Sequence, residues 1–187
     1  MWGGATGSAL ATTGSIRSAL AVVLESYGIR SMLDAPCGDA TWINLVSGID
    51  GVRYTGVDIS QKVIGHNRKR LSGAVFDPFD SEVDKVAVDD AMERGQGLRH
   101  PTDLMLHLPA RHNLRVLRNI QASGARFLMA STFVNANENH VSETFVPPVG
   151  HSINLSLPPY CLPEPIALIK DDSSDRPDLR MGLWEVR

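Results

Sequence analysis

One stretch decides the fold, and its sequence is Ser31-Met32-Leu33-Asp34-Ala35-Pro36-Cys37-Gly38-Asp39-Ala40-Thr41-Trp42. Its apolar residues predict a short buried strand that ends at Asp34, and Pro36, Cys37 and Gly38 predict a tight turn. Asp39 can cap the following helix by accepting backbone N–H bonds. A strand, a loop and a helix in this order place free N–H groups at the carboxyl edge of a parallel sheet, where nucleotide-like ligands bind.

A second strand and a second acidic residue follow. Segment 53–59 predicts another short strand, and Asp58 marks its end, 24 positions after Asp34. That interval is close to the ~20 positions expected between the phosphate loop and the acidic ribose ligand of a Rossmann unit. A pyrophosphate needs three glycines at this loop, but only Gly38 is present, and the carboxylate of Asp34 would repel it. The pattern disfavours a nicotinamide oxidoreductase and favours a ligand with a positive centre and a ribose.

The words Leu-Asp-Ala-Pro-Cys-Gly-Asp at 33–39 and Tyr-Thr-Gly-Val-Asp-Ile at 54–59 resemble the first and second motifs of class I S-adenosylmethionine-dependent methyltransferases. With Trp42 added, the wording is similar to a small subgroup of unassigned substrate. The resemblance implies an α/β, Rossmann-like fold with a mostly parallel sheet, an antiparallel edge strand and helices on both faces. It implies S-adenosylmethionine as cofactor, bound by Asp34, Ala35, Pro36, Cys37, Gly38, Asp39, Trp42, Asp58, Ile59, Asp77 and Arg17.

Length and composition restrict the class of protein further. A chain of 187 residues is long enough for one domain with a full core. A net charge of −3 gives no electrostatic footprint for nucleic acid. Cys37 and Cys161 do not make a disulfide scaffold, so we expect both to be reduced, in a cytoplasmic setting. No apolar run approaches the ~20 residues of a membrane span, and we expect no signal peptide.

The amino-terminal segment 1–14 has two interpretations. Its glycine, serine, threonine and alanine content is typical of a frayed tail. The resembling methyltransferases instead carry a Gly/Ser-rich arm that ends in a Thr and an Ile-Arg pair, matched here by Thr13, Ile16 and Arg17. The resemblance implies that this arm closes over the cofactor.

The first half of the chain predicts alternating helices and strands. Helical spacing of apolar residues predicts helices over 15–27 and 40–47, and Ser60 is placed to cap a third over 61–70. The basic residues of that third helix are expected on a solvated face. A third strand is predicted over 73–78. Asp77, near its end, is a candidate for the cofactor's adenine amino group or a simple turn aspartate before proline.

The fourth strand is the hardest element to place. The favoured register starts it at Pro101-Thr102-Asp103 and continues through 104–106 to His107. The other register places it at 86–89 and makes 91–106 an insertion. In either register the segment departs from the family pattern of an Asp, three apolar residues, an Arg-Asp pair and His-Leu-Pro.

The rest of the chain fits the same architecture. We expect a helix over 110–123, a fifth strand over 126–130, a lid over 133–150, and a closing pair of strands over 165–170 and 181–186. The turn Leu157-Pro158-Pro159-Tyr160 is similar to a nucleic-acid amino-methyltransferase motif. We reject that interpretation because Leu157 cannot accept an amino hydrogen and the turn follows the fifth strand, not the fourth.

Two side chains remain as candidates for chemistry. His107 at the mouth of the sheet is a candidate general base, or else a histidine that caps the next helix. Cys37 is interpreted as a small loop residue because nothing marks a paired base. The other histidines show no spaced partners, so no metal site is predicted. We expect methyl transfer to an unidentified acceptor; the alternative is a non-catalytic interaction protein that keeps the fold.

Overall fold

The computed structural model describes residues 10, 13–58, 60–78, 97–100, 104–139, 152–170 and 176–186. For 76–78 and 97–100 it describes the backbone alone. Of the arm expected at 1–14, this leaves Leu10, Thr13 and Gly14. The expected lid is described only over 133–139.

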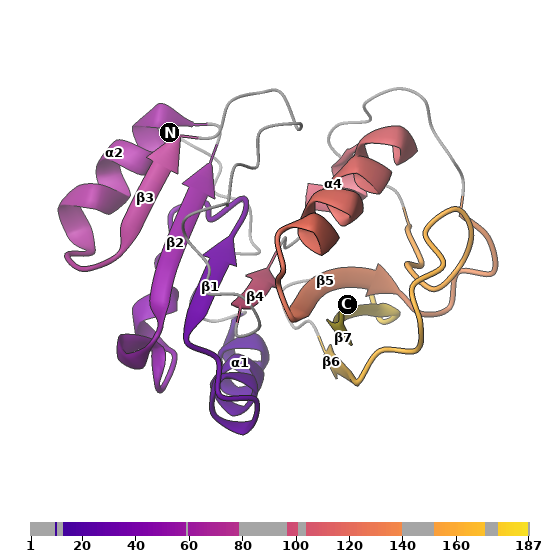
Figure 1. Cartoon of the computed structure of the whole chain (residues 1–187), viewed down its shortest axis with the longest axis horizontal. Helices are drawn as coiled ribbons and strands as arrows, with labels where there is room; N and C mark the ends of the chain where they lie inside the picture. Colours follow the sequence, from indigo (N-terminus) through magenta and orange to yellow (C-terminus); the bar gives the residue numbers. More distant parts are fainter. Residues whose placement is uncertain are drawn as a thin grey trace.

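One seven-stranded sheet organises the molecule, in the order β3-β2-β1-β4-β5-β7-β6 (Figure 1). The strands are β1 Ser31–Asp34, β2 Arg53–Asp58, β3 Val75–Pro78, β4 Gly97–His100, β5 Phe127–Phe133, β6 Ala167–Lys170 and β7 Leu179–Glu185. The pairings among β3, β2, β1, β4 and β5 are parallel, whereas β7 pairs antiparallel with both β5 and β6. Among the strands described, β7 therefore runs against all the others. The antiparallel strand predicted at the edge of the sheet lies one place in from it, because β6 pairs with the outer side of β7.

Two of the central strands are buried along their whole length. Every residue of β1 and of β5 is buried. Alternate residues of β5 pack into two different cores: Phe127 and Met129 into one, Leu128 and Ala130 into the other. A strand buried on both faces must carry apolar residues at successive positions, as β5 does.

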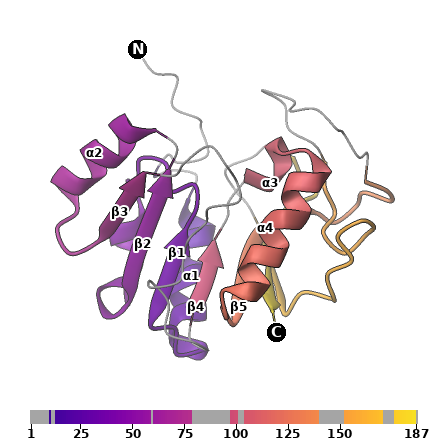
Figure 2. The same cartoon turned by 45° about the horizontal axis from the view of Figure 1, so that its top comes forward.

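Helices cover both faces of this sheet. The core that contains Phe127 also contains buried residues of α1 Gly14–Ser26 and α2 Gln61–Arg70. The core on the other face contains residues of α3 Leu104–His107 and α4 Ala110–Ala122. Figure 2 shows α4 in front of the sheet and α1 behind it. No helix in the described ranges is long and apolar enough to cross a membrane.

The order of the strands reverses at β1, which pairs with β2 on one side and with β4 on the other. In open α/β sheets, ligands bind outside the carboxyl ends of the strands at such a switch point. Asp34 ends β1 and Asp58 ends β2. The sheet therefore brings these two acidic residues to the same edge, as the sequence predicts.

The helix predicted over 40–47 is wrong. Two short 3₁₀ turns replace it, η2 Ile43–Leu45 and η3 Ile49–Gly51. Between them Gly48 has a φ of 84°, in the left-handed region that glycine favours. Apolar spacing still buries Ile43, Val46 and Ile49, but the backbone of Val46 is extended, with a ψ of 121°, so the helical turn ends at Leu45.

The favoured register of the fourth strand is also wrong. β4 is Gly97–His100, whereas Leu104–His107 forms the short helix α3. A short apolar run fits a buried helical turn as well as a strand, and periodicity cannot separate them. The amide of Asn113 donates to the backbone oxygen of Met105 at 2.8 Å, which satisfies a carbonyl within α3. The alternative strand at 86–89 lies outside the described residues.

Most other predicted elements are confirmed within a few residues. They are α1, α2, α4, and strands β1, β2, β3, β5, β6 and β7. Ser60 caps α2 as predicted, because its Oγ accepts a hydrogen bond from the Val63 amide at 3.4 Å. The fifth strand runs three residues further than expected, to Phe133, because Ser131 and Thr132 are buried within it.

Candidate cofactor site

The candidate site begins with two buried carboxylates at the carboxyl edge of the sheet. Asp34 is 3% exposed and Asp58 is 8% exposed. Burial of a charged side chain is costly unless hydrogen bonds compensate it. The partners of these two carboxylates therefore show how the site is built.

Asp58 joins the loop after β1 to the start of α2. Its Oδ2 accepts a hydrogen bond from the Gly38 amide at 3.1 Å, and its Oδ1 accepts one from the Ser60 amide at 2.8 Å. Each carboxylate oxygen has a second lone pair, so Asp58 keeps acceptor capacity for a ligand hydroxyl. One side chain thus connects both motifs found in the sequence.

The loop 37–40 folds against the end of β2. The Cys37 amide donates to the backbone oxygen of Val57 at 2.9 Å. Gly38 has a φ of 53°, in the left-handed region, and a Cβ added there would meet no atom within 4 Å. The loop thus presents its backbone to open space at Gly38, so a ligand can approach that backbone closely.

Asp34 is held from inside the core by Tyr54. The Tyr54 hydroxyl donates to Asp34 Oδ2 at 2.7 Å, and both side chains are buried. Burial, then the charge of Asp34 and this hydrogen bond, raises the pKa of Tyr54 well above its ordinary value. Tyr54 therefore stays protonated and acts as a fixed donor to the carboxylate.

Cys37 has an unreactive thiol. Burial raises the pKa of its thiol far above its ordinary value, and the charges of Asp34 and Asp58 raise it further. A thiol is nucleophilic only as the thiolate, so Cys37 is no nucleophile at neutral pH.

Two side chains of α2 hold the loop from the other side. The Asn67 amide donates to the backbone oxygen of Gly38 at 2.8 Å. The Arg70 guanidinium donates to the backbone oxygens of Asp39 and Ala40 at 2.7 and 2.8 Å. The basic residues of this helix are exposed, as predicted, and Arg70 in addition binds the loop.

The remaining residues predicted at the loop have varied surroundings. Asp39 is exposed and its Oδ1 accepts hydrogen bonds from the Thr41 amide at 3.2 Å and the Thr41 hydroxyl at 3.0 Å. Trp42 is 8% exposed and belongs to the core that contains α1. Ala35 and Pro36 are half-buried.

Arg17 on α1 binds backbone oxygens at the end of the arm. Its guanidinium donates to Leu10 at 3.1 Å and to Thr13 at 3.4 Å. Ile59 and the side chain of Asp77 lie outside the described residues.

His107 is the last residue of α3 and is half-buried. The sequence placed His107 at the end of the fourth strand, and that prediction is wrong. The residue at the end of β4 is His100, which pairs in register with Asp34. Because α3 follows β4 by four residues, His107 still comes after the carboxyl end of that strand.

The turn at 157–160 packs as the sequence predicted. Tyr160 is 9% exposed and belongs to the core beneath α4, where its hydroxyl accepts a hydrogen bond from the Asn113 amide at 3.3 Å. Burial raises the pKa of Tyr160 above its ordinary value. The turn is a packing element of this face.

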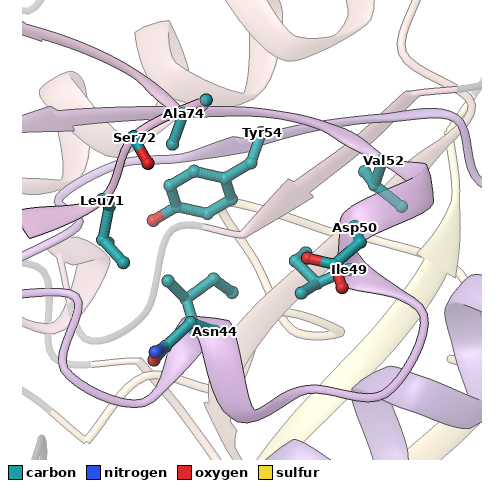
Figure 3. Close-up of a pocket in the computed structure, with 10 residues that line it drawn as sticks. Asn44, Ile49, Asp50, Val52, Tyr54, Leu71, Ser72 and Ala74 are labelled. Atoms are coloured by element: carbon teal, nitrogen blue, oxygen red, sulfur yellow. The ribbon is translucent and has the colours of Figure 1, made fainter.

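Two cavities of about 270 and 400 Å³ lie near the amino ends of the strands, away from Asp58. Val52, which precedes β2, lines both, and Figure 3 shows Val52, Asp50 and Tyr54 around the smaller one. Neither is lined by loop 37–40. Across the ranges that the structure describes, no three His, Cys, Asp or Glu side chains are grouped to hold a metal ion.

Sequence reasoning missed Tyr54, Asn67 and Arg70. Tyr54 has the same parity as the inward residues of β2, which could have placed its hydroxyl inside. Asn67 and Arg70 are three residues apart and so share one helix face, but no local pattern shows what that face meets.

Comparison with known proteins rests on structure. No protein-family model and no curated protein matches the sequence. The PH0226 protein from Pyrococcus horikoshii OT3 is 14% identical over 96% of this chain and 93% of its own, with a TM-score of 0.64. The methyltransferase domain of bacterial CtHen1-C is 18% identical, with a TM-score of 0.50. That alignment covers 63% of this chain and 64% of the CtHen1-C chain.

A third similar structure belongs to work on the conversion of a disulfide bond into a thioacetal group during echinomycin biosynthesis. It is 15% identical over 89% of this chain and 81% of its own, with a TM-score of 0.55. At such identities the likeness shows the fold alone. The chain thus has a Rossmann-like fold of the kind found in class I methyltransferases.

Proposed function

We propose that this protein binds S-adenosylmethionine at the carboxyl edge of β1 and β2 and transfers its methyl group to an acceptor. The observation that carries the proposal is the hydrogen bond from the Gly38 amide to Asp58 Oδ2, which joins the two motifs at the switch point of the sheet. The resemblance of those motifs to methyltransferase motifs supports it.

The charges at this edge fit such a cofactor. Asp34 and Asp58 are acidic, and the guanidinium of Arg70 is bound to backbone oxygens of the loop. This surrounding favours a sulfonium and an amino group and disfavours a pyrophosphate. The open space beside Gly38 leaves room for a ligand to approach the backbone.

Each residue has a proposed role drawn from the sequence. Asp58 accepts hydrogen bonds from the ribose hydroxyls, and Asp34 faces the positive end of the cofactor. Ala35, Pro36, Cys37, Gly38 and Asp39 form the loop around it, with Ile59, Asp77, Trp42 and Arg17 as further contacts.

When bound, the cofactor supplies an electrophilic methyl group on a positively charged sulfur. The protein's contribution is chiefly to hold an acceptor in line with that methyl group. His107 is proposed to take the proton that the acceptor oxygen or nitrogen loses.

Calorimetry with S-adenosylhomocysteine and with NAD tests the binding claim. We expect the purified protein to bind the first and not the second. Asp58→Asn should weaken binding, and Asp50→Asn is the matched control because Asp50 is an exposed carboxylate on η3. Binding of NAD in preference to S-adenosylhomocysteine, or equal affinity in both variants, would contradict the proposal.

Methyl transfer needs its own experiment because the acceptor is unidentified. Labelled S-adenosylmethionine is incubated with the protein and with small-molecule, protein and RNA extracts, and transferred label is counted. Binding without transfer to any extract would favour a non-catalytic role for the same site.

A further inference from the structure

Helix α2 contacts the loop 37–40 through two polar side chains. Asn67 and Arg70 lie three residues apart on α2, so their side chains leave the same face of the helix. Asn67 reaches the backbone oxygen of Gly38, and Arg70 reaches those of Asp39 and Ala40. Three consecutive carbonyls of the loop are therefore bound by one helix.

These contacts complement those of Asp58. The carboxylate of Asp58 binds the amide of Gly38, whereas Asn67 binds the carbonyl of the same residue. The Asn67 amide also points at Cys37 Sγ, at 3.8 Å. The amide and the carbonyl of Gly38 are thus both hydrogen-bonded. These two bonds fix the orientation of the loop at the glycine that a ligand can approach.

Asn67 is poorly explained as a residue that only stabilises the fold. It is 0% exposed, and its Oδ1 is buried with no hydrogen-bond partner in the part of the chain that the structure describes. A buried oxygen without a partner destabilises a protein. The amide donor to Gly38 is what an apolar replacement would remove.

Resting on the proposed function, we propose that Asn67 and Arg70 are positioning residues for the cofactor. They hold loop 37–40 in the conformation that binds S-adenosylmethionine, and so α2 sets the affinity of a site formed by the ends of β1 and β2. A loop that occupies the competent conformation a tenth of the time raises the apparent Kd about tenfold.

The main test is Asn67→Leu, with Asn113→Leu as its matched control. Asn113 is also 0% exposed, and its Oδ1 is also buried without a partner among the described residues. Its amide likewise donates to a backbone oxygen at 2.8 Å, but that oxygen belongs to Met105 on α3 and not to the loop. We expect folded Asn67→Leu to bind S-adenosylhomocysteine about tenfold more weakly than the wild type. The affinity of Asn113→Leu should match that of the wild type.

Arg70→Met is the second test, and it decides the matter if Asn67→Leu fails to fold. Lys69→Met is its control, because Lys69 is an exposed neighbour on the same helix. We expect weaker S-adenosylhomocysteine binding in Arg70→Met alone.

Cys37 reports on the loop directly. In a Cys161→Ser background the buried Cys37 is the sole thiol, since the chain has two cysteines. Its reaction with a thiol reagent should be faster in Asn67→Leu and in Arg70→Met than in their controls, and S-adenosylhomocysteine should slow it.

The outcomes separate this inference from the proposed function. If the wild type binds no S-adenosylhomocysteine, the proposed function falls and this inference falls with it. If the wild type binds and both α2 variants keep wild-type affinity and wild-type Cys37 labelling, the positioning role alone is overturned.

Discussion

Removal of the Asp58 carboxylate should destabilise the folded protein even without a ligand. Asp58→Ala deprives the Gly38 and Ser60 amides of their acceptor, at 3.1 and 2.8 Å in the native structure. A hydrogen bond to a charged group contributes about 1.5–3 kcal/mol. Because Gly38 and Ser60 are half-buried, water can replace part of this loss, and we expect a decrease of about 3 kcal/mol in the free energy of unfolding.

Urea denaturation at pH 7, followed by circular dichroism without ligand, measures this change. Asp50→Ala is the control, and we expect it to change the free energy of unfolding by less than about 0.5 kcal/mol because Asp50 is exposed. A loss in Asp58→Ala no larger than in Asp50→Ala would refute the reasoning. It would mean that the two amide bonds contribute nothing net to the fold.

Three further predictions concern other residues. Tyr54→Phe should lower stability by about 1.5–3 kcal/mol at pH 8, since Asp34 loses its donor. Because the pKa of Tyr54 is raised in the folded state, wild-type stability should fall as pH rises above about 10, and less so in Tyr54→Phe; equal falls in denaturation at pH 8 and 10.5 would contradict this. Ser60→Ala should cost about 0.5–1 kcal/mol by loss of the helix cap, and an unchanged urea midpoint would speak against that cap. With an acceptor in hand, His107→Ala should keep S-adenosylhomocysteine binding and lose about 10²–10⁴-fold in rate; a lower melting temperature with an unchanged rate per folded molecule would indicate a capping role.

The site could be predicted where a strand and the acidic residue at its end lie in the same short segment. Met32 and Leu33 predict a strand because they are apolar, and Asp34 marks its end because a carboxylate is costly inside a sheet. The same holds for Asp58 after β2. Since parallel strands share a carboxyl edge, the two acids could be placed together without coordinates.

Other elements were not predictable because their local patterns are ambiguous. Leu104-Met105-Leu106 fits a strand or a buried helical turn, and the Asn113 amide that binds Met105 comes from a later helix. The predicted helix over 40–47 was wrong because the backbone becomes extended at Val46, after a single 3₁₀ turn. Local spacing records which side chains are apolar, but not whether the backbone continues in one direction.

The sequence by itself determined most of the strands and helices, the two acidic strand ends and the glycine of the loop. These depend on neighbours within a few residues, where hydrophobicity and backbone preference act directly. Only the tertiary structure decided what holds that loop. Tyr54 binds Asp34 across two strands, and Asn67 and Arg70 bind the loop from 29 to 31 residues away. Such contacts depend on how β1, β2 and α2 pack together, and no local pattern specifies that packing.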